Sequence, residues 1–324
     1  MSGKADNDRI CAALDLGTSN CRLLIARPDR GTFKVIDSFS RIIRLGESLD
    51  RDGCLSEAAM ARAIKSLRVC ADKMTRRSVT HSRAVATEAC RRAENGQSFL
   101  ARVADETGIR FEVINPETEA ALAAAGCVSL IDTDARDAGV DRALLFDIGG
   151  GSTQVATLAL RHEGFDIIGS HSLPWGVVTL AEHQAKSGDD YYDAANMVAR
   201  LLAPVEADEE LGPLIAADRV AMLGTSGTVT TLAAVHLDLP RYDRKKVDGL
   251  DMTFVDIRAV SRQLNGLNVS ERAAIGCIGS NRADLVVAGC AILEGICATW
   301  PVGRLRVADR GLREGILLGL MGSP

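Results

Sequence analysis

The most regular pattern along the chain is a short apolar run that leads into an Asp-x-Gly turn and is followed by a second apolar run. It occurs first with residues 11–14, a turn that begins at Asp15, and residues 22–26. It occurs again with residues 143–146, a turn that begins at Asp147, and residues 154–160. Apolar runs on both sides of a glycine-containing turn are typical of β-hairpins. The sequence therefore predicts the same hairpin twice, far apart in the chain.

Two copies of one hairpin predict two homologous α/β halves, each of which contributes its turn to a shared cleft. The acidic, turn-rich residues 132–142 fit a linker between the halves. A chain of 324 residues, of which 47% are hydrophobic, is also larger than one typical core requires.

Helix signals lie between and after the hairpins. Ser56 precedes a run with apolar residues at helical spacing and is predicted to cap it. Asn115 and Pro116 open a predicted helix that ends at about residue 130, because proline is favoured in the first helical turn. The second half predicts a strand at 220–223, a turn at 224–228 leading into a helix to about 235, a helix from 282 to about 299, a strand at 305–308 and a final helix.

The glycine-rich turns suit phosphate binding, because small residues let backbone N–H groups approach phosphate oxygens. The hydroxyl groups of Thr18, Ser19, Ser152 and Thr153 could add donors. A mobile turn is the alternative for the glycine run 149–151 taken alone, but the duplication with an aspartate at the same place favours phosphate binding. The segment after Gly151 is strand-like, which argues against a dinucleotide-binding fold, and no P-loop motif is present.

Three acidic residues are candidates for chemistry. Asp15 and Asp147 each end an apolar run, where a carboxylate could hold Mg²⁺ against phosphates or, alternatively, cap its own turn. Glu119 lies in the first turn of the helix that Pro116 opens and could accept a proton from an attacking water. The helix dipole also favours acidic residues in that turn, so this position alone does not establish a general base.

Charge, cysteine spacing and the apolar stretches limit which classes of protein and ligand remain. The net charge of −5 argues against a general nucleic-acid surface. A phosphate-rich ligand would then need local cations, and the candidates are Arg22, Arg91, Arg92 and the basic residues 244–246. These residues could equally form a solvated basic face. Nine cysteines form no C-x-x-C pair, which favours reduced, buried thiols. The polar N-terminus lacks a signal-peptide pattern and the apolar stretches are too short to span a membrane, so we expect a soluble cytoplasmic protein.

Taken together, the motifs resemble the exopolyphosphatase and guanosine pentaphosphate phosphatase family. Within that family, the chain resembles the short-form members, which have no long C-terminal extension. This family belongs to the acetate kinase, sugar kinase, Hsp70 and actin superfamily. The resemblance spans nearly the whole chain. It rests on residues 15–22, 44–47, 86–91, 95–96, 119–120, 147–153, 173–176, 227–228, 232–234 and 311–315.

The resemblance implies an α/β fold with two actin-like, RNase H-like domains and an active site in the cleft between them. Domain I is expected at 1–132, with the helix at about 310–324 packed back onto it, and domain II at 133–309. Glu119 matches the family's general base, and Asp15, Asp147 and Gln154 are the expected Mg²⁺ residues. The expected phosphate-binding residues are Gly17, Thr18, Ser19, Asn20, Arg22, Arg91, Gly149, Gly150, Gly151, Ser152, Thr153, Gly227 and Thr228.

The chain departs from the family pattern in two turns. Thr18-Ser19-Asn20 replaces the more frequent Ser or Thr, Asn, then Ser or Asn, and largely keeps the hydrogen-bonding capacity. Gln154 stands where the family usually has glutamate, which removes one charge from the metal site. A glutamine carbonyl can still bind a metal or orient water.

The expected activity is release of terminal phosphate from inorganic polyphosphate, from guanosine pentaphosphate, or from both, in a homodimer linked to the stringent response. A regulator that binds these ligands with little turnover is the alternative that Gln154 raises, although retention of Glu119 argues against it. A kinase or ATPase of the same superfamily is a third possibility, which would need an acceptor site or a polymerising surface.

Overall fold

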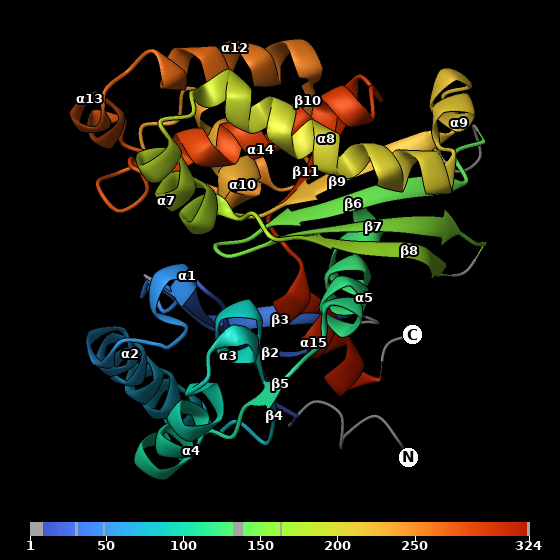
Figure 1. Cartoon of the computed structure of the whole chain (residues 1–324). Coiled ribbons are helices and arrows are strands. Elements are labelled where there is room, and N and C mark those ends of the chain that lie inside the picture. Colours follow the sequence, from blue (N-terminus) through green and yellow to red (C-terminus); the bar gives the residue numbers. More distant parts are fainter. Residues whose placement is uncertain (1–8, 30–31, 48, 132–138, 163, 323–324) are drawn as a thin grey trace. The chain divides into compact units, whose positions relative to one another are not determined.

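The computed structural model describes residues 9–29, 32–47, 49–131, 139–162 and 164–322, which form two compact units. Unit 1 comprises Met1–Gly126 with Gly311–Pro324, and unit 2 comprises Cys127–Arg310. The expected domain boundary lay at 132/133, within the predicted linker 132–142. Residues 132–138 of that linker lie outside the described residues. Figure 1 shows that each unit has its own sheet.

The sheet of unit 1 has the strand order β3-β2-β1-β4-β5. Strand β1 (Cys11–Leu16) pairs antiparallel with β2 (Asn20–Asp29), which pairs antiparallel with β3 (Thr32–Ile42). On its other side β1 runs parallel to β4 (His81–Ala86), and β4 runs parallel to β5 (Glu112–Val113). The first predicted hairpin is confirmed, and it lies at the centre of this sheet.

Helices pack on both faces of this sheet. Alternate residues of β1, from Ala12 to Leu16, share a core with α2 (Glu57–Arg76) and α4 (Gly96–Thr107). Cys11 and Ala13 point the other way, where α5 (Pro116–Cys127) and α15 (Leu312–Met321) lie. The shorter helices α1 (Leu49–Asp52), α3 (Glu88–Arg92) and η1 (Val128–Leu130) connect these elements, although η1 belongs to unit 2. Ser56 caps α2 as predicted, by accepting a hydrogen bond from the Ala59 N–H.

Close contact between α15 and α5 predicts opposite effects for two glycines of one helix. A Cβ at Gly315 would lie 1.9 Å from the Leu122 carbonyl oxygen of α5, whereas one at Gly319 would meet no described atom within 4 Å. Gly315→Ala should therefore lower the free energy of unfolding by about 1–3 kcal/mol through overpacking. Gly319→Ala should raise it by up to about 1 kcal/mol, because alanine is the better helix former. Urea denaturation of both variants tests this; equal effects would contradict it.

The sheet of unit 2 repeats the same arrangement, with the order β10-β11-β9-β6-β7-β8. Strand β6 (Arg142–Ile148) pairs antiparallel with β7 (Thr153–Leu160), and β7 with β8 (Phe165–Leu173). It runs parallel to β9 (Val220–Thr225), which runs parallel to β11 (Arg304–Ala308). Strand β10 (Asp251–Thr253) adds an antiparallel edge. Because β8-β7-β6-β9-β11 matches β3-β2-β1-β4-β5, the duplication extends from the hairpin to the whole sheet.

Large helices cover one face of the second sheet. Leu144, Phe146 and Ile148 of β6 share a core with α8 (Tyr191–Glu209), α10 (Gly227–His236), α12 (Phe254–Asn265) and α14 (Val286–Thr299). Asp147 therefore lies on the opposite face. The unit also contains α7 (Val177–Ser187), α9 (Gly212–Ala216), α11 (Arg244–Val247) and α13 (Val269–Ala274).

The helix predicted to start at Arg282 starts four residues later, at Val286. Residues 280–285 form turns instead, and the Arg282 Nη1 donates a hydrogen bond to the Thr231 hydroxyl of α10 at 3.1 Å. This tertiary contact holds Arg282 in the turn, so the helical apolar pattern was extended too far toward the N-terminus.

The cysteines agree with the prediction of reduced, buried thiols. All nine cysteines are free thiols and all but Cys54 are buried.

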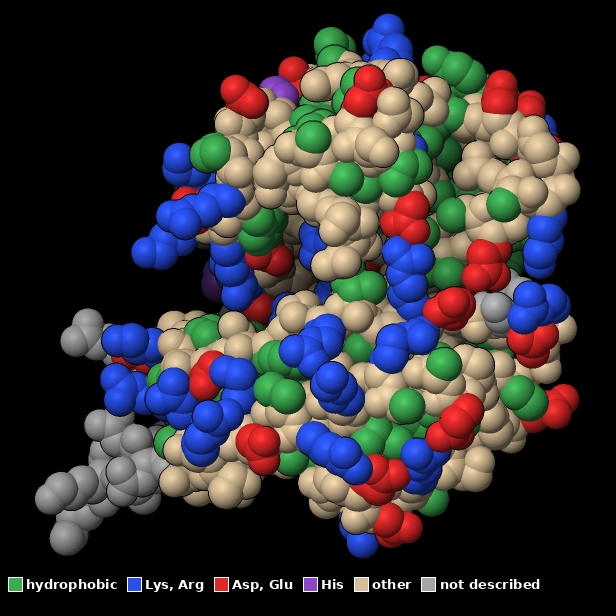
Figure 2. Space-filling model, turned by 90° about the vertical axis from the view of Figure 1, so that its left-hand side faces the viewer, with side chains coloured by type: hydrophobic (Ala, Val, Ile, Leu, Met, Phe, Trp, Pro, Cys, Tyr) green, Lys and Arg blue, Asp and Glu red, His purple; other side chains and the backbone are tan. Residues whose placement is uncertain are grey.

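Among the described helices, none combines the length and the apolar character needed to cross a membrane. Figure 2 shows basic side chains interspersed with acidic ones over the face that it presents. Several surface arginines form ion pairs, including Arg62–Glu47, Arg68–Glu106 and Arg102–Glu57.

Candidate phosphate-binding and catalytic residues

In unit 1, the candidate residues gather where three parallel strands end. The turn 17–19 follows β1, α3 follows β4, and α5 follows β5, so all three lie at the carboxyl edge of the sheet. The N–H of Thr87 donates to the Leu16 carbonyl at 3.2 Å and joins the start of α3 to the turn. The Gly17 N–H closes the turn on the Asn20 carbonyl at 2.9 Å. Ligand sites in α/β sheets occur at this edge.

Hydrogen bonding fixes which way the first turn presents its backbone. The Thr18 carbonyl accepts from the Gly46 N–H at 3.0 Å, and the Ser19 carbonyl accepts from the N–H groups of Ile43 and Arg44 at 2.7 and 3.0 Å. The N–H groups of Thr18 and Ser19 donate to no residue that the structure describes. Consecutive N–H groups without a protein acceptor, in a turn whose carbonyls are already bonded, suit an anion.

The Ser19 side chain supports the same conclusion. It is buried, and its hydroxyl oxygen has no hydrogen-bond partner within the described part of the chain. A buried hydroxyl without a partner costs free energy, which a ligand oxygen could recover. Thr18 is buried as well, and its methyl group packs beside Gly46.

Asp15 lies near two arginines and a second carboxylate. It is directly opposite Arg22 in the β1–β2 pair, so the two side chains share the face of the sheet on which α15 lies. Burial raises the pKa of Asp15, the guanidinium groups of Arg22 and Arg313 act to lower it, and the Glu314 carboxylate acts to raise it. The position of Arg22 directly opposite favours a role of Asp15 in holding that cation near the turn, and the metal role of Asp15 stays a prediction.

Glu119 is held at the start of α5 beside Arg91. Asn115 caps the helix by accepting from the Thr118 N–H at 2.8 Å, and the Glu119 N–H donates to the Asn115 carbonyl at 3.0 Å. The Arg91 Nη1 lies 3.6 Å from the Glu119 Oε2, and the carboxylate is only 15% exposed. A shielded carboxylate at the carboxyl edge of the sheet could act as a general base.

Unit 2 repeats the hydrogen-bond arrangement of the first turn with different partners. The Gly149 N–H closes the turn on the Ser152 carbonyl at 2.9 Å. The carbonyls of Gly149 and Gly150 accept from the N–H groups of Val177 and Val178, in the first turn of α7, at 2.9 and 2.8 Å. The N–H groups of Gly150 and Gly151 donate to no described residue. Helix α7 therefore binds the carbonyl side of the turn and leaves the N–H side for an anion.

Thr153 differs from the other predicted phosphate-binding residues in this turn. Its side chain is fully buried, and its hydroxyl donates to the Trp175 carbonyl at 2.7 Å. Thr153 therefore supports the turn by tying it to the segment before α7, whereas the Ser152 hydroxyl accepts from Gln154 at 3.3 Å.

Asp147 and Gln154 form the better candidate for a metal site. They are directly opposite each other in the β6–β7 pair, where Asp15 and Arg22 stand in unit 1. The Gln154 amide nitrogen donates to Ser172 at 2.9 Å, while its buried Oε1 has no partner among the described residues. A carboxylate beside an unpartnered carbonyl oxygen fits a hard cation such as Mg²⁺. No described group of three or more His, Cys, Asp or Glu could hold a metal, so ligand oxygens or water would complete such a site.

The start of α10 provides a third turn, with a cation that the sequence analysis missed. Ser226 caps the helix by accepting from the N–H groups of Thr228 and Val229, and its φ of +122° is a strained value for a residue with a side chain. A Cβ on Gly227 would lie 3.7 Å from the Arg282 guanidinium carbon. Arg282 thus lies beside Gly227, and only the tertiary fold distinguishes it from the other arginines of the chain.

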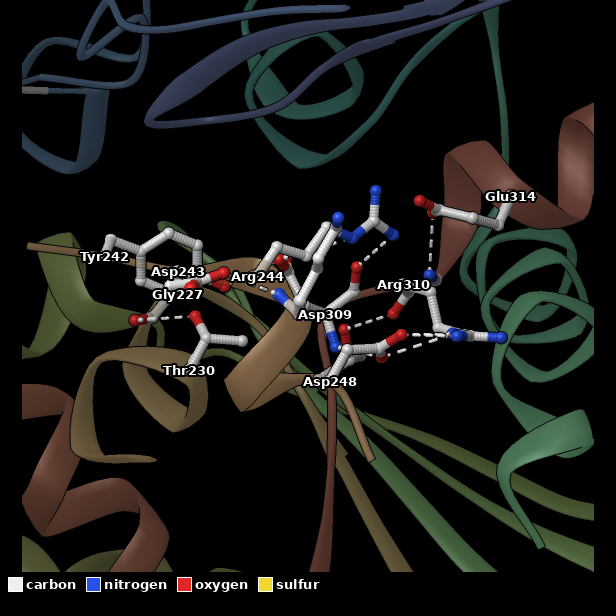
Figure 3. A network of polar contacts seen from close by, with 12 residues as sticks. Gly227, Thr230, Tyr242, Asp243, Arg244, Asp248, Asp309, Arg310 and Glu314 are labelled. Atoms are coloured by element: carbon white, nitrogen blue, oxygen red, sulfur yellow. Dashed lines mark hydrogen bonds and ion pairs between the residues drawn. The ribbon is translucent and has the colours of Figure 1, made fainter. Parts of the chain in front are cut away.

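The basic residues 244–246 are less suited to phosphate binding than expected. Arg244 donates to the Asp309 carbonyl at 2.5 Å and lies 3.5 Å from its carboxylate, which also accepts from the Tyr242 hydroxyl at 2.6 Å (Figure 3). Arg310 is bound in the same network by Asp248. Lys245 and Lys246 are exposed. This network mainly fixes the chain where β11 ends.

Comparison with known proteins shows similarity over almost the whole chain. A model of the Ppx/GppA phosphatase family matches residues 24–323. Exopolyphosphatase 2 of Mycobacterium tuberculosis is 29% identical over 328 residues, covering 96% of this chain and 98% of that protein. The solved Aquifex aeolicus PPX-GPPA enzyme is 30% identical, with a TM-score of 0.76 and 96% and 99% coverage. An exopolyphosphatase-like protein of known structure is 28% identical, with a TM-score of 0.83 and 96% and 97% coverage.

Proposed function

The chain belongs to the Ppx/GppA phosphatase family, and from this membership we propose that it is an exopolyphosphatase, which hydrolyses the terminal phosphoanhydride bond of inorganic polyphosphate. The name of the Mycobacterium tuberculosis relative supports this activity. Guanosine pentaphosphate is a second substrate consistent with the family, because its terminal phosphate is released by the same bond cleavage.

The observation that carries the proposal is the pair of turns with the same backbone arrangement. In each, the carbonyl groups bind protein N–H groups, and two consecutive N–H groups, of Thr18 and Ser19 or of Gly150 and Gly151, have no acceptor among the described residues. A substrate with a chain of phosphate groups matches two anion-binding turns better than a substrate with a single carboxylate does.

The side chains of unit 1 carry the proposed hydrolytic step. Arg22 and Arg91 stabilise the negative charge of the terminal phosphate, and the buried Ser19 hydroxyl donates to one of its oxygens. The Glu119 carboxylate accepts a proton from a water molecule, which attacks the terminal phosphorus in line with the bridging oxygen. The bond to that oxygen breaks, and orthophosphate and a shortened chain are the products.

A divalent metal fits the second turn, and we propose Mg²⁺. Asp147 would hold it through the carboxylate and Gln154 through Oε1, which the contact between the amide nitrogen and Ser172 leaves facing away from the serine. When bound, the ion would neutralise charge on the phosphate oxygens. Because the usual glutamate is replaced by Gln154, we expect weaker metal binding than in a family member that has both carboxylates.

The deciding assay is orthophosphate release from long-chain polyphosphate, guanosine pentaphosphate and ATP, each with Mg²⁺. We expect release from polyphosphate to be fastest. Faster release from guanosine pentaphosphate would reassign the main substrate, and formation of ADP alone would indicate an ATPase. No release from any of the three would contradict the proposed function.

Gln154→Glu tests the alternative of a binding protein with little turnover. In an active enzyme, the added carboxylate should lower the Mg²⁺ concentration needed for half-maximal activity by about tenfold. This corresponds to metal binding that is stronger by about 1.4 kcal/mol. If the natural protein binds polyphosphate without releasing phosphate, and Gln154→Glu alone restores release, the protein is a regulator instead.

A further inference from the structure

The short helix α3 places a second carboxylate, Glu88, against Arg91. Glu88 is the first residue of α3 and Arg91 lies one turn later. Both side chains are largely shielded, with 16% and 21% exposure. The Arg91 Nη2 donates to the Glu88 Oε2, while the other oxygen of Glu88 lies 3.7 Å from the Arg92 Nε. Ion pairs with this little exposure are screened less than surface pairs, so the contact constrains Arg91.

The other side of the same guanidinium is also fixed. The Arg91 Nη1 donates to the Ile114 carbonyl, directly before α5, at 2.7 Å. The Ile114 N–H in turn donates to the Ala86 carbonyl at the end of β4, at 3.1 Å. Because a guanidinium group is planar, holding Nη1 at Ile114 and Nη2 at Glu88 fixes its whole orientation. In this orientation Nη1 stays 3.6 Å from the Glu119 Oε2, beyond hydrogen-bond distance.

The distance between Arg91 and Glu119 affects how readily the Glu119 carboxylate can accept a proton. If Arg91 could rotate, it could form a close ion pair with Glu119, which would stabilise the carboxylate and make it a poorer proton acceptor. Glu88 competes for the same cation and keeps it in place. The first-turn position of Glu88 would suit the helix dipole as well, but its carboxylate contacts arginine side chains rather than helical N–H groups.

We propose that Glu88 is a positioning residue, which holds Arg91 at the distance from Glu119 that lets the cation bind phosphate while the carboxylate remains a base. The role rests on the proposed function, because it concerns the same hydrolytic step. It adds a residue of this chain to that step, and all of its contacts lie within unit 1.

Glu88→Gln tests the proposal through kinetics with polyphosphate. Removing the negative charge should lower kcat by about tenfold to a hundredfold, since small displacements of catalytic groups have effects of this size. KM should stay within about threefold, because Arg91 still binds phosphate. Glu88→Asp, which keeps the charge, should recover part of the lost kcat. The matched control is Glu57→Gln, which removes a carboxylate paired with Arg102 elsewhere in unit 1 and should have little effect.

A second measurement needs no turnover. Nuclear magnetic resonance of the Arg91 guanidinium, assigned with Arg91→Lys, should show separate Nη signals in the natural protein, because both nitrogens are bound. In Glu88→Gln the Nη2 signal should shift or merge with that of Nη1, because Nη2 loses its carboxylate partner. Identical Nη signals in both proteins, or an unchanged kcat in Glu88→Gln, would overturn the positioning role. If the natural protein releases no phosphate, the proposed function fails, and the guanidinium signals still decide whether Glu88 holds Arg91.

Discussion

Glu119→Gln should lower kcat for phosphate release by about 100- to 10,000-fold, the usual contribution of a general base. The amide has nearly the shape of the carboxylate but cannot accept the proton of the attacking water. Because Asn115 caps α5 through the Thr118 N–H and glutamine keeps the shape of the side chain, the free energy of unfolding should change little. Single-turnover phosphate release measures the chemical step directly.

Glu117→Gln is the matched control for this experiment. Glu117 lies in the same first turn of α5, carries the same charge, and is exposed. If both variants lose activity equally, the effect comes from the charge at the helix N-terminus rather than from a base at position 119. Activity of Glu119→Gln within a few-fold of the natural protein would exclude Glu119 as the base.

Gly176→Ala should abolish most phosphate release by displacing the second turn. A Cβ at this position would lie 2.4 and 2.5 Å from the carbonyl carbon and oxygen of Gly150, and 2.6 Å from the Gly149 oxygen. Either the turn or the start of α7 must move, although α7 binds both carbonyls. We expect a loss of at least about a hundredfold in kcat/KM, because the N–H groups of the turn would be misplaced, and a loss of about 1–3 kcal/mol in stability.

The control for this variant is Gly266→Ala, also in unit 2. Gly266 follows α12 with a negative φ, and an added Cβ would make only ordinary contacts of 3.5 and 3.6 Å. Its stability and activity should remain close to those of the natural protein in thermal denaturation and phosphate-release assays. Full activity of Gly176→Ala would show that the turn does not need this close backbone packing.

The sequence predicted the hairpins and the helix cap well, because the residues that specify them are neighbours in the chain. Both hairpins and the cap at Ser56 depend on neighbouring residues, and the structure has them where the sequence predicts. The predicted start of α14 was wrong, because Arg282 contacts Thr231 of α10, which is distant in the sequence. The cleft shared by the two halves, predicted from the duplicated hairpin, and the role of Glu119, implied by the family resemblance, remain predictions.

The sequence by itself determined the duplication, the two turns and the acidic residue next to the end of the first strand of each hairpin, because strand periodicity and glycine turns act over a few residues. Only the tertiary structure decided what those groups can do. It bonded the turn carbonyls to Gly46 and to α7. It also brought Arg91 to Ile114 and to Glu119, and Arg282 to Thr231. Hydrogen-bond partners and charge environments depend on contacts between distant segments, which no local pattern specifies.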